Sequence, residues 1–149
     1  MKIAADMWIA VVDGSKGLVL VNDGNAVEPK LSVRRVYGLD NPPTHEQGRD
    51  QPPRAYDAGG THRSAMEAPD LHQKAEDRFV QEFVRELEVD AEAGAFEKLV
   101  IVAPPVALGE LRRHVGPALA KRIVKEIAAD YVKMPVPEIA KAVAKALAG

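Results

Sequence analysis

Leu99 to Pro105 read LVIVAPP, and this stretch decides the fold class. Five apolar residues follow one another without a polar interruption, and Pro104 and Pro105 stop the run. A strand with one solvated face alternates between apolar and polar residues, whereas a short continuous apolar run indicates a strand that is covered on both faces. We therefore expect Leu99 to Ala103 to be the central strand of an α/β fold.

The N-terminal third predicts an antiparallel meander of three strands. Trp8 to Asp13 (WIAVVD) and Leu18 to Val21 (LVLV) are rich in β-forming residues, and the turn residues GSKG separate them. A second turn, NDGN, precedes the alternating run Leu31 to Tyr37 (LSVRRVY). GSKG is similar to fragments of phosphate-binding loops, but such a loop needs a helix N-terminus behind it, so we interpret GSKG as a turn.

Residues 70–94 predict the clearest helix of the chain. We expect Asp70 to cap its first N–H groups, with Gln73 reaching back to it, and Gly94 to end it. Apolar residues recur along this segment at helical spacing and form one stripe: Ala75, Phe79, Val80, Phe83, Val84 and Leu87. The charged residues between them occupy the outer faces, as in an amphipathic helix that packs on a sheet.

The C-terminal segments complete one domain that spans all 149 residues. Ala107 to Val115 has the length and spacing of a short helix, and Pro137 opens a small amphipathic one. Lys121 to Val132 is ambiguous, because its apolar residues also fit a helical spacing. Its place between two proline-bounded helices favours a strand, which gives a mixed sheet with an N-terminal meander and flanking helices.

Residues 38–70 differ from the rest of the chain, because prolines and glycines punctuate them and apolar periodicity is lost. A loop of this length inside a compact domain is usually functional or disordered, and the sequence leaves both interpretations open. Gly59 and Gly60 form a two-glycine tip, which allows close approach of the backbone to a ligand. Arg54 and Arg63 flank the glycines and are expected to contact phosphates.

Composition excludes several classes of protein. The chain has no cysteine, which excludes disulfides, thiolate nucleophiles and cysteine-ligated metals. Its net charge is -2, so no overall positive field attracts a nucleic acid and any such contact is local. We see neither a signal peptide nor an apolar run long enough to span a bilayer, and we expect a cytoplasmic protein without membrane contact.

Reactive side chains of the 38–70 region form no convincing site of their own. Its histidines and aspartates match no compact metal-ligand spacing, so we predict no metal ion and no cofactor; they are His45, Asp57, His62, Asp70 and His72. Asp57, His62 and Ser64 are the residue types of a nucleophilic triad. They share one glycine-rich loop, however, which lacks the rigid scaffold that a triad needs.

Carboxylates and arginines elsewhere are interpreted as surface. Asp6, Asp13 and Glu28 could belong to a two-magnesium nuclease site, but exposed carboxylates at strand ends are the simpler interpretation. Three small basic groups are interpreted as solvated surface at this modest net charge, with Arg54 set apart as a phosphate contact: Arg34 with Arg35, Arg49 with Arg54, and Arg112 with Arg113 and His114.

Taken together, the segments WIAVVDGSKGLVLV, LHQKAEDRFVQEFVRELE, LVIVAPP, LGELRRHV and KMPVPEIAKAV, with the proline-rich loop after the third strand, resemble the bacterial host-attachment protein family. The resemblance covers essentially the whole chain and depends on the order of these segments. That family is distantly similar to the middle domain of archaeal and eukaryotic class-1 translation release factors. The resemblance therefore implies a ribonuclease-H-like α/β fold.

In the release-factor domain a long loop carries Gly-Gly-Gln immediately before a long amphipathic helix, and the glutamine helps to place the hydrolytic water. Gly59 and Gly60 stand in the equivalent place here, with Thr61 in place of the glutamine. Threonine lacks the amide, although its backbone N–H can still stabilise an oxyanion. The resemblance thus implies binding to RNA, the ribosome or tRNA more strongly than it implies hydrolysis.

Three functions follow as hypotheses. The first is a non-catalytic release-factor-like module that binds RNA or the ribosome through Arg54, Gly59, Gly60 and Arg63. The second is a hydrolase of esters such as peptidyl-tRNA, for which Gly59, Gly60 and Thr61 are the candidate catalytic residues. The third is a surface protein that takes part in host attachment.

Overall fold

The computed structural model describes residues 2–38 and 68–148. The elements follow in the order β1 (Trp8–Val12), β2 (Lys16–Asn22), β3 (Leu31–Gly38), α1 (Ala68–Glu92), β4 (Leu99–Ala103), α2 (Pro105–Arg112), α3 (Pro117–Ala120), β5 (Ile123–Ala128) and α4 (Val136–Ala148). After the meander, helices and strands alternate except that α2 and α3 follow one another, and this is the α/β class that the sequence predicts.

The strands form one five-stranded mixed sheet in the order β3-β2-β1-β4-β5. β1, β2 and β3 are antiparallel neighbours, whereas β4 pairs in parallel with both β1 and β5. The prediction that Leu99–Ala103 is the central strand is wrong, because β1 holds the centre and β4 lies beside it. A continuous apolar run indicates that both faces of a strand are covered, and this is true of both β1 and β4. It does not indicate where the strand lies in the sheet.

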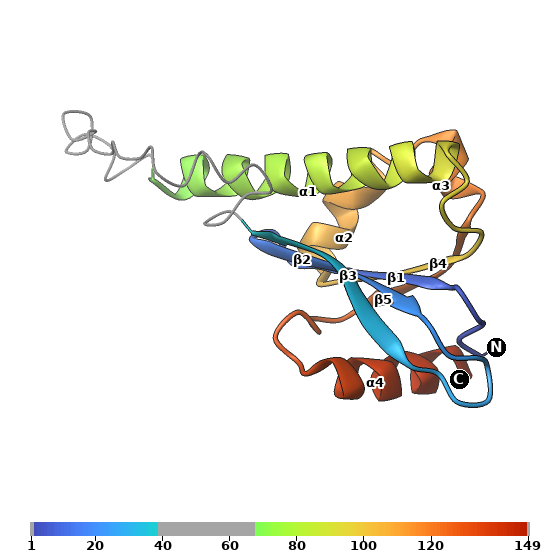
Figure 1. Cartoon of the computed structure of the whole chain (residues 1–149). Helices are drawn as coiled ribbons and strands as arrows, with labels where there is room; N and C mark the ends of the chain where they lie inside the picture. Colours follow the sequence, from blue (N-terminus) through green and yellow to red (C-terminus); the bar gives the residue numbers. More distant parts are fainter. Residues whose placement is uncertain (1, 39–67, 149) are drawn as a thin grey trace.

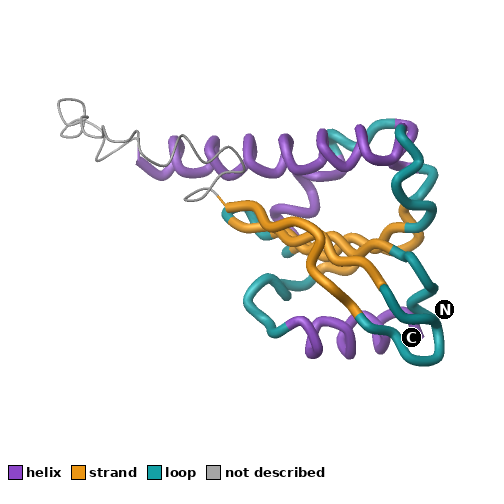
Figure 2. Tube along the Cα trace, viewed as in Figure 1, coloured by secondary structure: helices purple, strands orange, loops and turns teal. Residues whose placement is uncertain are grey.

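Three layers result, because α1, α2 and α3 cover one face of the sheet and α4 covers the other (Figures 1 and 2). Side chains of β1 alternate between the two faces, as the pleat requires. Trp8 and Val12 pack in the core cluster of the α1 face with Phe83, while Ile9 packs in the other cluster with Ile139. The apolar stripe predicted for the long helix is confirmed from Phe79 to Leu87, whereas Ala75 is only half-buried.

The long helix begins earlier than the sequence predicts. It starts at Ala68, so Asp70 occupies the third helical position and the expected cap is wrong. Proline is favoured in the first helical turn, which explains why the helix includes Pro69. Gln73 donates to Asp77 one turn further on, at 2.9 Å, instead of reaching back.

The end of the long helix agrees with the prediction. Gly94 has φ +75°, a left-handed conformation that glycine adopts without strain. Its N–H donates to the carbonyl of Ala91, and the N–H of Ala95 donates to that of Asp90, which is the Schellman pattern.

The C-terminal half contains one element that the sequence does not predict, the short helix α3. Glu88 of α1 caps it, because its carboxylate accepts the backbone N–H groups of Gly116 and Ala118 at 2.9 Å each. β5 confirms the choice of a strand for the ambiguous segment. α2 begins two residues before the predicted Ala107, because Pro105 fits the first turn of a helix.

Asn22 joins the N-terminal segment to the turn between β2 and β3, and its side chain is fully buried. Its NH₂ group donates to the carbonyl oxygens of Ile3, Ala4 and Asn25, and its oxygen accepts the backbone N–H groups of Gly24 and Lys30. The amide therefore satisfies backbone groups of two segments that lie far apart in sequence, and buried backbone groups left without a partner are destabilising.

We predict that Asn22→Ala lowers the free energy of unfolding by about 3 kcal/mol, because several buried donors and acceptors lose their partner at once. Chemical denaturation followed by circular dichroism measures the change. Lys30→Ala, which alters an exposed side chain of the same turn, is the control and should stay within about 0.5 kcal/mol of the unchanged protein. Equal effects of the two substitutions would contradict this role of Asn22.

Candidate functional site at the end of β3

The residues that the sequence singles out for function lie outside the described residues. Arg54, Gly59, Gly60, Thr61 and Arg63 all fall in the range 39–67, as do His45, Asp57, His62 and Ser64. The structure does describe the two elements that this range connects, β3 and α1. The site is therefore built from the residues that fix these two elements.

The first turns of α1 extend beyond the sheet (Figure 1). Leu71 to Lys74 are exposed, and the first buried side chain from residue 71 onward is that of Phe79. Glu76 lies against the turn between β1 and β2, where a methyl group on Gly14 would be 3.5 Å from the Glu76 Cβ. Residues 68–75 thus carry the helix about 12 Å past this turn, at 1.5 Å per residue.

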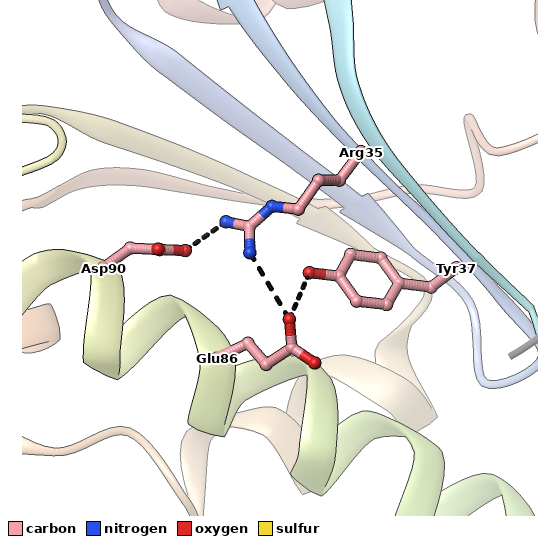
Figure 3. A network of polar contacts seen from close by, with 4 residues as sticks. All are labelled: Arg35, Tyr37, Glu86 and Asp90. Atoms are coloured by element: carbon pink, nitrogen blue, oxygen red, sulfur yellow. Dashed lines mark hydrogen bonds and ion pairs between the residues drawn. The ribbon is translucent and has the colours of Figure 1, made fainter. Parts of the chain in front are cut away.

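A polar network fastens the end of β3 to α1 (Figure 3). The Arg35 guanidinium forms ion pairs with Asp90 and with Glu86, the latter at 3.3 Å. The Tyr37 hydroxyl donates to the same Glu86 carboxylate at 2.7 Å. The Tyr37 ring also meets Phe83 edge to face, with centroids 5.2 Å apart. Polar and aromatic contacts of Tyr37 therefore hold β3 against α1, and Tyr37 directly precedes Gly38, the last residue of this strand.

A β-bulge determines the direction in which Arg34 and Arg35 of β3 point. Val19 pairs with Arg35 and Leu20 with Val33, so Arg34 is the extra residue of the bulge. Consecutive residues of a regular strand point to opposite faces, but a bulge changes this alternation. The guanidinium carbons of Arg34 and Arg35 accordingly lie 5.0 and 5.7 Å from the centre of the same Trp8 ring.

The network keeps its hydrogen-bond donors protonated at neutral pH. Burial and the hydrogen bond to Glu86 raise the pKa of Tyr37 well above its usual range. Burial lowers the pKa of Arg35, but the hydrogen bond to Asp90 and the neighbouring Tyr37, Asp90 and Glu86 outweigh this effect, so the net shift is upward. Neither group is suited to accept a proton in catalysis near neutral pH, and the network serves to position β3 and α1.

No metal centre is present in the part of the chain that the structure describes, where no three histidine, aspartate or glutamate side chains could hold an ion together. Asp6 precedes β1 and Asp13 follows it, so the strand separates them by roughly 20 Å. The Asp13 carboxylate accepts the N–H groups of Ser15 and Lys16 at 2.9 and 2.8 Å and closes the β1–β2 turn. The interpretation of GSKG as a turn is confirmed.

The basic groups interpreted as solvated surface are in part paired. Arg35 belongs to the network above, so that interpretation is wrong for this residue. Arg112 of α2 bridges to Glu126 of β5 at 2.8 Å, and His114 contacts Glu110 at 2.8 Å. Arg34 does lie exposed, as expected. No helix among the described residues has the length and apolar character needed to cross a bilayer.

Comparison with known proteins supplies the family. Residues 6–143 match the model of bacterial archaeo-eukaryotic release factor family 12. The chain belongs to this family. The match confirms the release-factor relationship that the order of segments implies, and it covers both elements of the site and the residues between them. No curated protein matches the sequence.

Among solved structures, the archaeal translation termination factor aRF1 is similar to this family 12 chain with a TM-score of 0.48 and 12% sequence identity. The similarity covers 95% of the chain and 39% of aRF1. The family 12 chain thus spans well under half the length of that factor.

Sequence reasoning did not find the network between β3 and α1. Arg35 and Tyr37 are two residues apart on a strand, and Glu86 and Asp90 are four apart on a helix, so each pair shares one face of its element. These spacings are a signal for two polar faces. A single sequence gives no sign that the two faces meet, because about fifty positions separate them.

We predict that Tyr37→Phe lowers the free energy of unfolding by about 1 kcal/mol at neutral pH and that this difference disappears in alkali. The folded-state pKa of Tyr37 is raised, so its stabilising effect is complete below the unfolded tyrosine pKa of about 10 and is lost as the pH rises beyond it. Denaturation of both proteins across this range measures the difference.

Tyr131→Phe is the control, because the structure shows no hydrogen bond of the Tyr131 hydroxyl to another described residue. A difference between the unchanged protein and Tyr37→Phe that stays constant into strong alkali would show that the hydroxyl of Tyr37 does not stabilise the fold through Glu86.

Proposed function

We propose that this protein is a non-catalytic release-factor-like module that binds the ribosome or tRNA through residues 39–67. In this proposal Arg54 and Arg63 contact phosphates, and Gly59 and Gly60 let the backbone approach the RNA closely. The observation that carries the proposal is membership of a release-factor family over residues 6–143, a range that includes this segment and both elements that bound it.

The described elements support this use of the segment. β3 is fastened to α1 by Arg35 and Tyr37, and α1 extends past the sheet at the end where the segment joins it. A ligand-contacting segment benefits from a rigid support, because less conformational freedom is then lost on binding. In this proposal the protein binds the ribosome or tRNA in the cytoplasm.

The net charge of the chain determines how strongly we expect the protein to bind RNA. The net charge is -2, so binding depends on a few local cations and not on a general positive field. Two phosphate contacts to a single strand predict that affinity falls only about sevenfold when the salt concentration is raised fourfold. Loss of the two arginines should remove most of this salt dependence.

We predict that the protein sediments with ribosomes, or binds tRNA, at low salt, and that the double variant Arg54→Ala, Arg63→Ala binds about tenfold or more weakly. Co-sedimentation over a series of salt concentrations measures both effects. Arg85→Ala with Lys121→Ala removes two exposed cations elsewhere and is the matched control. Absence from the ribosomal fraction at low and high salt, together with no binding to tRNA, would sink the proposal.

Hydrolysis is the second candidate, because the two glycines directly precede Thr61, whose backbone N–H could stabilise an oxyanion. The glutamine amide of release factors is missing, so we predict no turnover of peptidyl-tRNA by the purified protein. The assay is release of the peptide from labelled peptidyl-tRNA. Turnover that Gly59→Ala and Gly60→Ala abolish without changing thermal unfolding would establish the hydrolase instead.

A role at the cell surface is the third candidate and comes from the resemblance to host-attachment proteins. It predicts that the protein leaves the cytoplasm. Fractionation of cells followed by immunodetection separates the two locations, and we expect the cytoplasmic fraction to hold the protein.

A further inference from the structure

A second candidate site lies at the other end of α1. There the N-terminal segment, the starts of β1 and β4, the turn after α1 and the bulge of β3 surround a hollow of about 620 Å³. Cavities of this size accept a small molecule or one nucleotide. Gly94 borders this hollow, and Glu76 lies against the β1–β2 turn at the opposite end of the sheet, so about 27 Å along the helix separates the hollow from that turn.

Stacked planar groups form one wall of the hollow. The rings of Trp8 and Phe96 stack with centroids 4.6 Å apart, and each is only 3% exposed. The Arg34 guanidinium lies over the Trp8 ring at 5.0 Å. Arg34 is exposed, and in the described residues it has no carboxylate partner, unlike its neighbour Arg35. A planar cation is therefore presented to solvent on an immobile aromatic base.

Charged side chains of both signs border the same hollow without pairing. Arg34 and Lys98 supply positive charge, and Asp6 and Glu97 supply negative charge. No ion pair or side-chain hydrogen bond joins any of these four to a described residue. Asp23, a third carboxylate that lines the hollow, accepts the Ser32 hydroxyl at 2.5 Å. These four side chains are exposed and have no partner among the described residues, so they are free to contact a ligand that carries both hydrogen-bond donors and negative charge.

Asp6 borders the hollow from a β-turn, in which the N–H of Met7 donates to the carbonyl of Ala4. Its φ is +64°, the left-handed region that few residues other than glycine adopt and that aspartate tolerates. Its backbone N–H donates to the carbonyl of Asn22, which holds this conformation. The turn therefore fixes the backbone position from which Asp6 borders the hollow.

We propose that this hollow binds an unpaired nucleobase, with guanine preferred. The base stacks on the Arg34 guanidinium, its Watson–Crick edge faces Asp6 and Glu97, and its phosphate approaches Lys98. Arginine planes stack on splayed bases in RNA recognition, and lysine contacts phosphate as a point charge. Guanine offers two neighbouring N–H donors on this edge, which a carboxylate accepts together.

Uracil is discriminated against by the same groups, because its edge carries one N–H donor between two carbonyl acceptors. It therefore lacks the pair of neighbouring donors that a carboxylate accepts together, and a carbonyl faces the carboxylate instead. The site is independent of residues 39–67, and it adds a base-selective contact that the proposed function does not include. A base within a single strand and a free nucleotide present the same chemistry, and the experiment separates them.

Trp8 is the single tryptophan of the chain and therefore reports on this hollow by its fluorescence. The protein is titrated with the short RNAs UUGUU, UUAUU and UUUUU and with GMP, and anisotropy of labelled RNA gives the affinities in parallel. We expect a saturable change of Trp8 fluorescence with UUGUU and at least about tenfold tighter binding of UUGUU than of UUUUU. A response to GMP alone indicates a free nucleotide, and a response to UUGUU alone indicates a strand; either supports the site.

Substitutions in the hollow test which side chain makes which contact with the base. Arg34→Ala and Arg34→Lys should each weaken UUGUU binding about tenfold, because alanine removes the stacking plane and lysine restores only the charge. Asp6→Asn with Glu97→Gln should abolish the preference for guanine, and asparagine tolerates the left-handed backbone at position 6. Arg85→Ala removes an exposed arginine of α1 outside the hollow and should change nothing.

Equal binding of UUGUU and UUUUU together with no response to GMP would overturn the inference, as would equal effects of Arg34→Ala and Arg85→Ala. The double variant Arg54→Ala, Arg63→Ala separates this inference from the proposed function. It should bind the ribosome or tRNA about tenfold or more weakly and keep the full Trp8 response. Loss of the Trp8 response in that variant would place the RNA on residues 39–67 and overturn the assignment to the hollow.

Discussion

The contact of Arg35 with Glu86 and Asp90 is the interaction on which the arrangement of β3 and α1 depends. β3 is an edge strand, so only β2 holds it through backbone hydrogen bonds. Ion pairs at a surface contribute little, but here the partners are half buried and share a hydrogen bond with Tyr37, which strengthens the set. Glycine at position 17 completes the fit, since a Cβ there would lie 2.7 Å from the Phe83 ring.

The helix α1 organises both candidate sites. Its first turns, which directly follow residues 39–67 in sequence, extend past the sheet. Its other end leads into the hollow lined by Trp8 and Arg34. The helix has 25 residues and is about 37 Å long, so one RNA strand of moderate length reaches both ends. A contact that selects a base at one end and a backbone contact at the other would together fix the register of such a strand.

The fold class could be predicted from sequence because burial leaves a direct trace in apolar pattern. The runs LVIVA and WIAVV and the stripe through Phe79, Phe83 and Leu87 were sufficient for the layers and for most elements. The start of α1 and the helix α3 were missed. Pro69 is favoured in the first turn, so α1 begins earlier in the sequence than expected. The cap of α3 is Glu88, whose carboxylate accepts backbone N–H groups about thirty positions further along the chain.

The candidate sites were less predictable for a related reason. Arg34 and Arg35 look alike in sequence, yet the bulge opposite Val19 and Leu20 gives Arg35 two carboxylates and leaves Arg34 exposed over Trp8. A bulge depends on the pairing between two strands, and a single amino-acid sequence does not show that pairing. The residues named from the release-factor resemblance lie outside the described residues, and their roles stay predictions.

Amide hydrogen exchange tests most directly whether Arg35 fastens β3 to α1. In Arg35→Met the apolar stem is retained and both ion pairs are lost, so we predict that amides of β3 and of the C-terminal half of α1 exchange about tenfold faster, while those of β1 and β4 are unchanged. Arg34→Met, which removes no ion pair, should leave β3 unaffected. Unchanged protection of β3 in Arg35→Met, or equal acceleration throughout the sheet, would contradict the account.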